Sequence, residues 1–154
     1  MNDTEFLADQ LRRAHMGQAW HGPSLRESLA GVTAEMASIR PVPQVHTIWE
    51  VVRHISAWLP AVGQRLEGQA VELTGEHDWP AADSSEAAWQ KTLADLDRET
   101  ERLQETISKL PPDALRKGVP GHGSVRFMLE GVIQHHLYHA GQIALLKKMV
   151  PARG

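Results

Sequence analysis

The sequence contains no cysteine. This absence excludes disulfide bonds, metal sites built from thiolates, and a nucleophilic cysteine. A transition-metal site in this chain would have to be built from histidine, aspartate, glutamate and water. Histidine, by contrast, is abundant, with nine residues in a chain of 154. Their placement along the chain is therefore the first feature to examine for function.

Long hydrophobic runs and basic clusters are also missing. No apolar run approaches the ~18 residues that cross a bilayer. The N-terminal segment MNDTEFLADQLRRAH carries acidic residues where a signal peptide carries basic ones. The net charge is −3 with neutral histidines, and no five or six basic residues cluster. We therefore expect a cytoplasmic protein that binds neither membranes nor nucleic acid.

Strand-like alternation of β-branched residues is scarce, which predicts an all-α fold. The length fits a single domain spanning residues 1–154. Capping boxes at Ser24–Glu27 and Thr47–Glu50 mark two helix starts, and Pro60 predicts a kink or break inside the helix that follows Thr47. Apolar periodicity predicts five helices, at residues 4–18, 24–40, 48–67, 86–110 and 125–149.

The predicted connection over residues 68–85 is longer than two antiparallel neighbouring helices require. Its length predicts a crossover that joins two parallel helices of a bundle.

The last predicted helix carries His135 and His139 on one narrow arc, four residues apart. Their side chains then lie one turn above each other, so two imidazole nitrogens can reach one metal ion at ~2.0–2.1 Å. His54, inside the third predicted helix, is the candidate third ligand. Three protein ligands leave a position for water or substrate, which is typical of a catalytic site. Glu50, one turn before His54, is a candidate catalytic base or orienting group.

The same histidines also fit an interpretation without metal. A histidine on an apolar helix face can simply pack and donate to a backbone carbonyl, and spacing alone leaves both interpretations open. His136 points away from His135 and is expected to pack or to support a ligand. His46 is expected to lie at the entry of a helix. The other four histidines, near turns and helix ends, are expected to be solvated: His15, His21, His77 and His122.

Two segments resemble hallmarks of a known family. HHLYHAGQIALLKK resembles the closing motif of the DinB/YfiT-like superfamily, and HTIWEVVRHISAW resembles its capped helix with one histidine followed by tryptophan. The segments WHGPSLRESLAGVTAEMASIRP and DWP are similar to those of one bacterial subgroup of that family. The resemblance covers nearly the whole chain.

The resemblance implies a four-helix bundle of up-down-down-up topology, here with an extra N-terminal helix. It also implies a divalent metal held by His54, His135 and His139, and a homodimer. Characterised relatives are metal-dependent thiol transferases or isomerases that use low-molecular-weight thiols such as bacillithiol or mycothiol.

Three functions fit these features. The first is a metal-dependent transferase that uses a low-molecular-weight thiol on a small electrophilic substrate. The second is a metal-dependent hydrolase with a metal-bound hydroxide as nucleophile. The third is a non-catalytic metal-binding stress-response protein. Imidazole ligands suit zinc best, while nickel, iron and manganese fit the same ligands.

Overall fold

Helices dominate the computed structural model, which describes residues 1–150. Its α-helices are α1 (Asp3–Met16), α2 (Leu25–Leu29), α3 (Ala34–Ser38), α4 (Ile48–Leu66), α5 (Glu86–Ser108) and α6 (Val125–Met149). Two 3₁₀ helices, η1 (Gly75–His77) and η2 (Pro112–Arg116), and a two-stranded antiparallel hairpin, β1 (Gly118–Val119) and β2 (Gly123–Ser124), complete the chain. The prediction of a mainly α-helical protein is confirmed.

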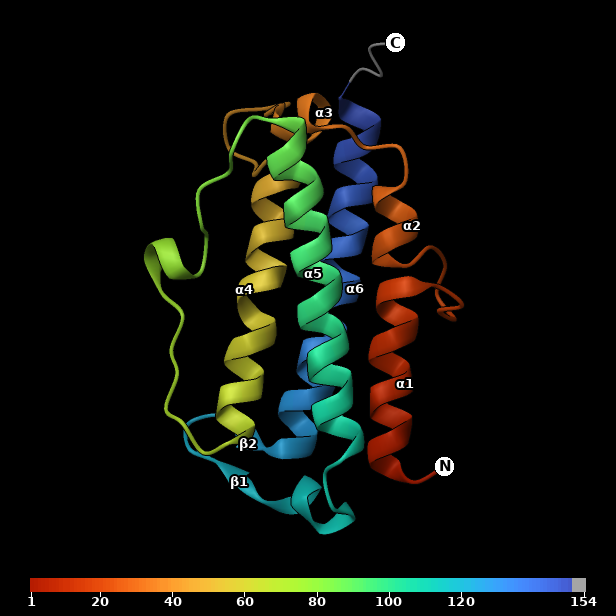
Figure 1. Ribbon diagram of the computed structural model, residues 1–154, viewed down its shortest axis with the longest axis vertical. Coiled ribbons are helices and arrows are strands. Elements are labelled where there is room, and N and C mark those ends of the chain that lie inside the picture. Colours follow the sequence, from red (N-terminus) through yellow and green to blue (C-terminus); the bar gives the residue numbers. More distant parts are fainter. Residues whose placement is uncertain (151–154) are drawn as a thin grey trace.

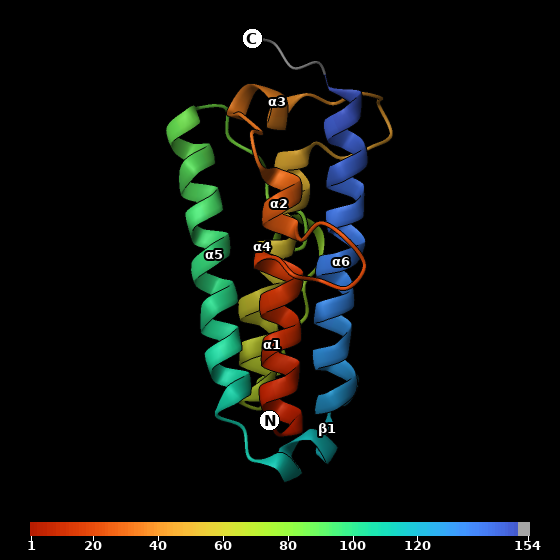
Figure 2. The same ribbon diagram turned by 90° about the vertical axis from the view of Figure 1, so that its right-hand side faces the viewer.

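The four long helices α1, α4, α5 and α6 lie side by side around one apolar core (Figures 1 and 2). The chain rises in α1, descends in both α4 and α5, and rises again in α6 (Figure 1). The connection between α4 and α5 runs back along the outside of α4, and α2 lies beyond the end of α1 (Figure 1). The helix expected at residues 4–18 is α1, which packs against both α5 and α6.

Helix starts follow the local sequence. Thr47 accepts a hydrogen bond from the Glu50 amide at 3.1 Å, and the Glu50 carboxylate accepts one from the Thr47 amide at 2.8 Å. Ser124 likewise caps α6 by accepting from the Phe127 amide at 3.1 Å. These bonds satisfy amides that the first turn of a helix leaves unpaired, which is why the predicted starts of α4 and α6 match the structure.

The helix predicted over residues 24–40 is wrong, because the structure contains two short helices there, α2 and α3. The first helix ends at Leu29, and Gly31 adopts a left-handed φ of 74° in the turn that follows it. Thr33 then caps α3, and the Glu86 carboxylate accepts from the Ala34 amide at 2.9 Å. Trp89 secures the break by donating to the Val32 carbonyl at 2.8 Å.

Of the kink or break expected at Pro60, the break does not occur, since α4 continues through Pro60 to Leu66. Pro60 lies on an exposed side of the helix. Water can therefore bind the carbonyl that the proline ring leaves without an amide partner.

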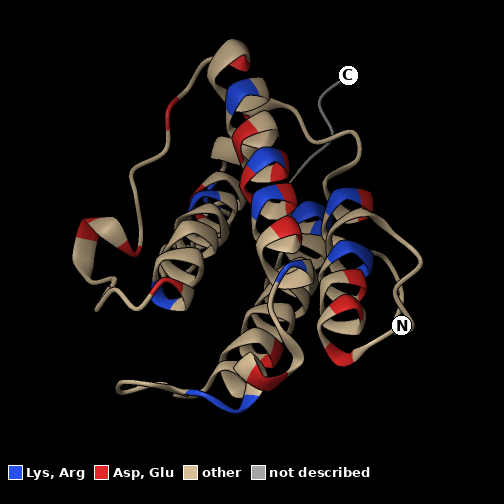
Figure 3. Cartoon of the chain, turned by 60° about the horizontal axis from the view of Figure 1, so that its bottom comes forward, with Lys and Arg blue, Asp and Glu red and all other residues tan. Residues whose placement is uncertain are grey.

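Acidic and basic residues are interspersed along the outer face of α5 (Figure 3). Lys91, Asp95 and Arg98 form one such alternating set, with nitrogen–oxygen distances of 2.6 Å and 2.8 Å. This mixture is typical of a solvated helix face. Within residues 1–150, no helix combines the length and apolar character needed to cross a membrane.

Candidate metal centre

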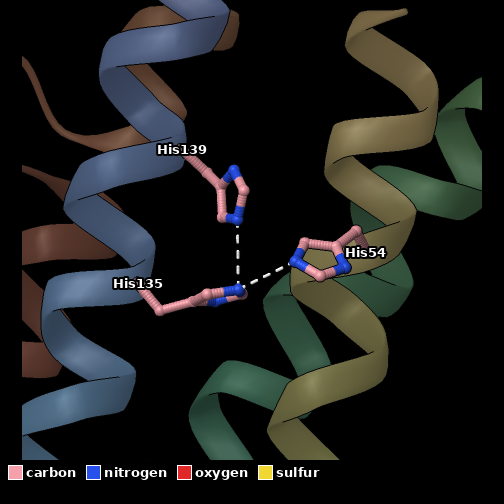
Figure 4. Close-up of side chains that lie close together, drawn as sticks. All are labelled: His54, His135 and His139. Atoms are coloured by element: carbon pink, nitrogen blue, oxygen red, sulfur yellow. Dashed lines mark hydrogen bonds between the residues drawn. The ribbon is translucent and has the colours of Figure 1, made fainter. Parts of the chain in front are cut away.

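The packing of α4 against α6 brings three histidines together (Figure 4). His135 and His139 project from successive turns of α6, and His54 projects from α4 towards them. The Nε2 atom of His135 lies 2.9 Å from Nε2 of His54 and 3.1 Å from Nε2 of His139. His54 and His139 are buried, with 6% and 4% of their surface exposed. We call these three residues the histidine cluster.

The spacing of the cluster matches the spacing of ligands around one ion. Two nitrogens at ~2.0–2.1 Å from an ion are separated by roughly 2.9–3.4 Å when the angle between them is about 90–109°. Both measured separations fall in this range. One ligand atom from each residue can be chosen so that all lie within 4.8 Å of one another.

The outer nitrogens of two cluster histidines face hydrogen-bond acceptors. His54 Nδ1 lies 2.8 Å from the Asp78 carbonyl oxygen and 3.0 Å from the Asp78 carboxylate. His139 Nδ1 lies 2.6 Å from the side-chain oxygen of Gln142. Because these oxygens only accept, each Nδ1 carries the proton and each Nε2 presents a lone pair to the centre of the cluster. This arrangement is typical of metal-ligating histidines.

Burial favours the neutral form of two cluster histidines, His135 and His139. Burial, together with the charges of His139 and His54, lowers the pKa of His135 to about 3. Burial also lowers the pKa of His139, although its hydrogen bond to Gln142 opposes the shift. Neutral imidazole is the form that binds metal. The chemistry of the three side chains therefore fits a divalent cation.

The segment Asp78–Trp79, in the connection between α4 and α5, holds His54 in place. The Asp78 carboxylate also accepts from Trp58 Nε1 at 2.8 Å. The Trp79 ring stacks on His54 at 4.0 Å between centroids and on His46 at 3.6 Å. No role for Asp78 or Trp79 follows from the spacing of residues in the sequence. The DWP motif was the available signal, but its contact with His54 spans 24 residues.

A cavity of about 710 Å³ opens beside the cluster. All three cluster histidines line one part of it, and Tyr138 lines it as well. Its apolar walls come from α4, α6 and the turn before α6, and they include Trp58, Val62, Phe127, Met128 and Val132. A cavity of this size and character is typical of a site for a small molecule.

Glu50 lies outside the cavity, and His15 is buried in another part of the protein. Glu50 does not line the cavity, and its carboxylate bonds Thr47, Arg40 and His46. The expectation that His15 is solvated is wrong. That side chain is 1% exposed, and its Nε2 lies 2.7 Å from Asp97.

His136 and His122 differ in how far they are buried. His136 is completely buried, in agreement with a packing role. His122 lines the cavity, and its side chain is 23% exposed, so it is only partly accessible to solvent.

Comparison with known proteins identifies the family. A sequence model of the DinB superfamily matches residues 19–143. The chain belongs to the DinB superfamily. The matched region contains all three cluster histidines and Asp78, whereas α1 precedes it. No curated protein and no solved structure matches the chain significantly.

In this member of the DinB superfamily, Asp78→Ala is expected to weaken divalent-metal binding about tenfold. The loss of the carboxylate removes one acceptor at Nδ1 of His54 and leaves the Asp78 carbonyl there, and such supporting partners contribute about 10–100-fold to metal affinity. Competition with a chromophoric chelator measures the change. Asp83→Ala, in the same connection but exposed, is the matched control. Equal affinities for the Asp78 variant and the wild type would contradict the orienting role.

Proposed function

We propose that the protein is a metal-dependent transferase that uses a low-molecular-weight thiol on a small electrophilic substrate. In this proposal, His54, His135 and His139 bind one divalent cation, with zinc favoured and nickel, iron or manganese as alternatives. They do so inside a four-helix bundle of up-down-down-up topology. The convergence of the Nε2 atoms of three histidines at the wall of an apolar cavity carries the proposal.

In this proposal, the histidine cluster, its hydrogen-bond partners and the cavity walls have different roles. The histidine cluster holds the cation, while Asp78 and Gln142 fix the tautomers of His54 and His139. When bound, the cation supplies a positive charge that favours the thiolate form of a coordinated thiol. The apolar walls hold the electrophile against the cluster and exclude water, which would compete with the thiol as nucleophile. The absence of cysteine is compatible with a thiol supplied by a second molecule.

Hydrolysis at the same cation is the alternative enzymatic function. It requires a general base within hydrogen-bond reach of the attacking water. Among the described residues that line the cavity there is no carboxylate, and Asp78 contacts the outer side of His54. These positions favour the thiol-dependent transferase. A non-catalytic metal-binding protein is the third possibility, and the thiol experiment below separates it from both enzymes.

Metal content of protein purified without a histidine tag is the first test. We expect about one equivalent of a divalent metal by mass spectrometry, because the chain offers one cluster of suitable ligands among the described residues. Metal-free protein that resists reconstitution would overturn the proposal.

Thiol binding is the second test. The cobalt-substituted protein should develop a thiolate-to-cobalt absorption band that saturates with added low-molecular-weight thiol. The matched alcohol, which lacks sulfur, is the control. Metal-loaded protein with no saturable thiol binding and no transferase activity across several thiols and electrophiles would exclude the thiol-dependent function. Hydrolytic activity without any thiol would then favour the alternative enzyme.

A further inference from the structure

A buried positive charge lines the cavity and has no role in the proposed metal site. Arg65, near the C-terminal end of α4, lines the cavity and is only 6% exposed. Its Nε and Nη2 atoms donate to the Val71 carbonyl at 2.9 Å and 2.7 Å. Its Cζ atom lies 5.2 Å from the centre of the Trp58 ring. These contacts fix the guanidinium in one orientation but do not neutralise its charge.

Glu72, the acidic residue paired with Arg65, is too distant and too exposed to form a strong ion pair with it. The Glu72 carboxylate lies 3.8 Å from Arg65 Nη2 and 3.0 Å from Nε2 of His122. Its side chain is 71% exposed, and it does not line the cavity. An ion pair at this distance in water is weak. Nη1 of Arg65 makes no hydrogen bond to any residue in the described part of the chain. A buried guanidinium with a free donor is a favourable partner for an incoming anion.

His122 brings a second polar group to the same place. It lies in the turn of the β1–β2 hairpin, which Figure 1 shows beside the C-terminal end of α4. The hairpin thus contributes a ring nitrogen to a cavity whose other walls are largely apolar.

We propose that Arg65, with His122 beside it, forms a subsite for the carboxylate of a small organic acid bound in the cavity. A single guanidinium matches a singly charged carboxylate, whereas a phosphate dianion would remain half neutralised. The Trp58 ring lies 5.8 Å from the His135 ring, so the guanidinium and the cluster are within about 11 Å of each other. The ligand class is therefore an acid whose carboxylate and reacting group are joined by a short apolar spacer.

This inference rests on the proposed function for the identity of the reacting group. The binding of the carboxylate does not depend on it. Its test therefore uses protein treated with a chelator, in which a carboxylate has no metal to bind. Phenylbutyrate and its uncharged amide are the probes, and titration calorimetry gives both affinities. We expect the wild type to bind the acid about tenfold more tightly than the amide. Equal affinities would overturn the subsite.

Variants locate the source of this preference. In Arg65→Gln the ratio of the two affinities is expected to fall to about one, because glutamine can still donate to Val71 but carries no charge. Arg65→Lys should keep part of the preference. Arg53→Gln removes the same charge from the same helix at a position outside the cavity, so it should retain the full preference. An unchanged ratio in Arg65→Gln would overturn the assignment.

A wild-type measurement decides the matter if Arg65→Gln does not fold. The Nε–H resonance of Arg65, assigned by its loss in Arg65→Lys, should shift with the acid and not with the amide. A resonance that saturating acid leaves unmoved would overturn the proposal. The two proposals can fail separately: acid preference without any metal binding refutes only the metal function, and metal binding without acid preference refutes only the subsite.

Discussion

Alanine at His54 or His139 is expected to reduce the metal content of the purified protein from about one equivalent to nearly none. Each substitution leaves two imidazoles, and two protein ligands rarely hold a divalent cation. We expect the dissociation constant to rise on the order of a thousandfold, or ~4 kcal/mol. Mass spectrometry of the purified proteins, followed by competition with a chelator, measures both quantities.

Two histidine variants serve as matched controls. His122 lines the same cavity outside the cluster, and His46 stacks on Trp79, which in turn stacks on His54. His122→Ala and His46→Ala should therefore retain about one equivalent of metal. Circular dichroism checks that every variant folds. Retention of full metal content in His139→Ala would assign that residue to packing and would remove the basis for the metal centre.

Acid is expected to destabilise the metal-free protein through His136. Burial, together with the charges of His15 and His135, lowers the pKa of this completely buried side chain to about 3. The unfolded chain takes up the proton below pH ~6.5, whereas the folded chain does not until near pH 3. The free energy of unfolding therefore falls as the pH drops through this window. At pH 5 the contribution of His136 is ~2 kcal/mol.

His136→Leu tests this contribution. Leucine is apolar and close to histidine in size, so it can fill this buried position while removing the titrating group. The stability lost between pH 7.5 and pH 5, measured by urea unfolding, should be smaller by ~2 kcal/mol in the variant. His77→Gln, at an exposed position of η1, should leave the loss unchanged. An identical loss in His136→Leu and the wild type would contradict the assignment.

Most helix positions could be predicted because they depend on contacts within a few residues. The apolar stripe and Ser124 cap of α6 are local, and the helix runs over Val125–Met149 as predicted. The failure at residues 24–40 has a long-range cause. The carboxylate of Glu86 and the indole of Trp89, both on α5, stabilise the interruption around Gly31. Periodicity within the segment carries no information about those partners.

In the candidate site, too, the features set by local helix geometry could be predicted, whereas those set by tertiary packing could not. The sequence by itself determined that His135 and His139 share one face of a helix, because helical geometry relates residues four apart. It also indicated His54 as a third candidate, but only the packing of α4 against α6 brought the Nε2 atoms of His54 and His135 to 2.9 Å.

Tertiary structure alone decided the surroundings of the histidine cluster. Asp78 reaches His54 across 24 residues of chain, and the hairpin carrying His122 meets the C-terminal end of α4 near Arg65. Tertiary structure also buried His15, which the sequence analysis had expected to be solvated, and placed Glu50 outside the cavity. The physical reason is the range of the interactions. Helix geometry and capping act within one or two turns, whereas burial and contacts between distant segments depend on how the whole chain packs.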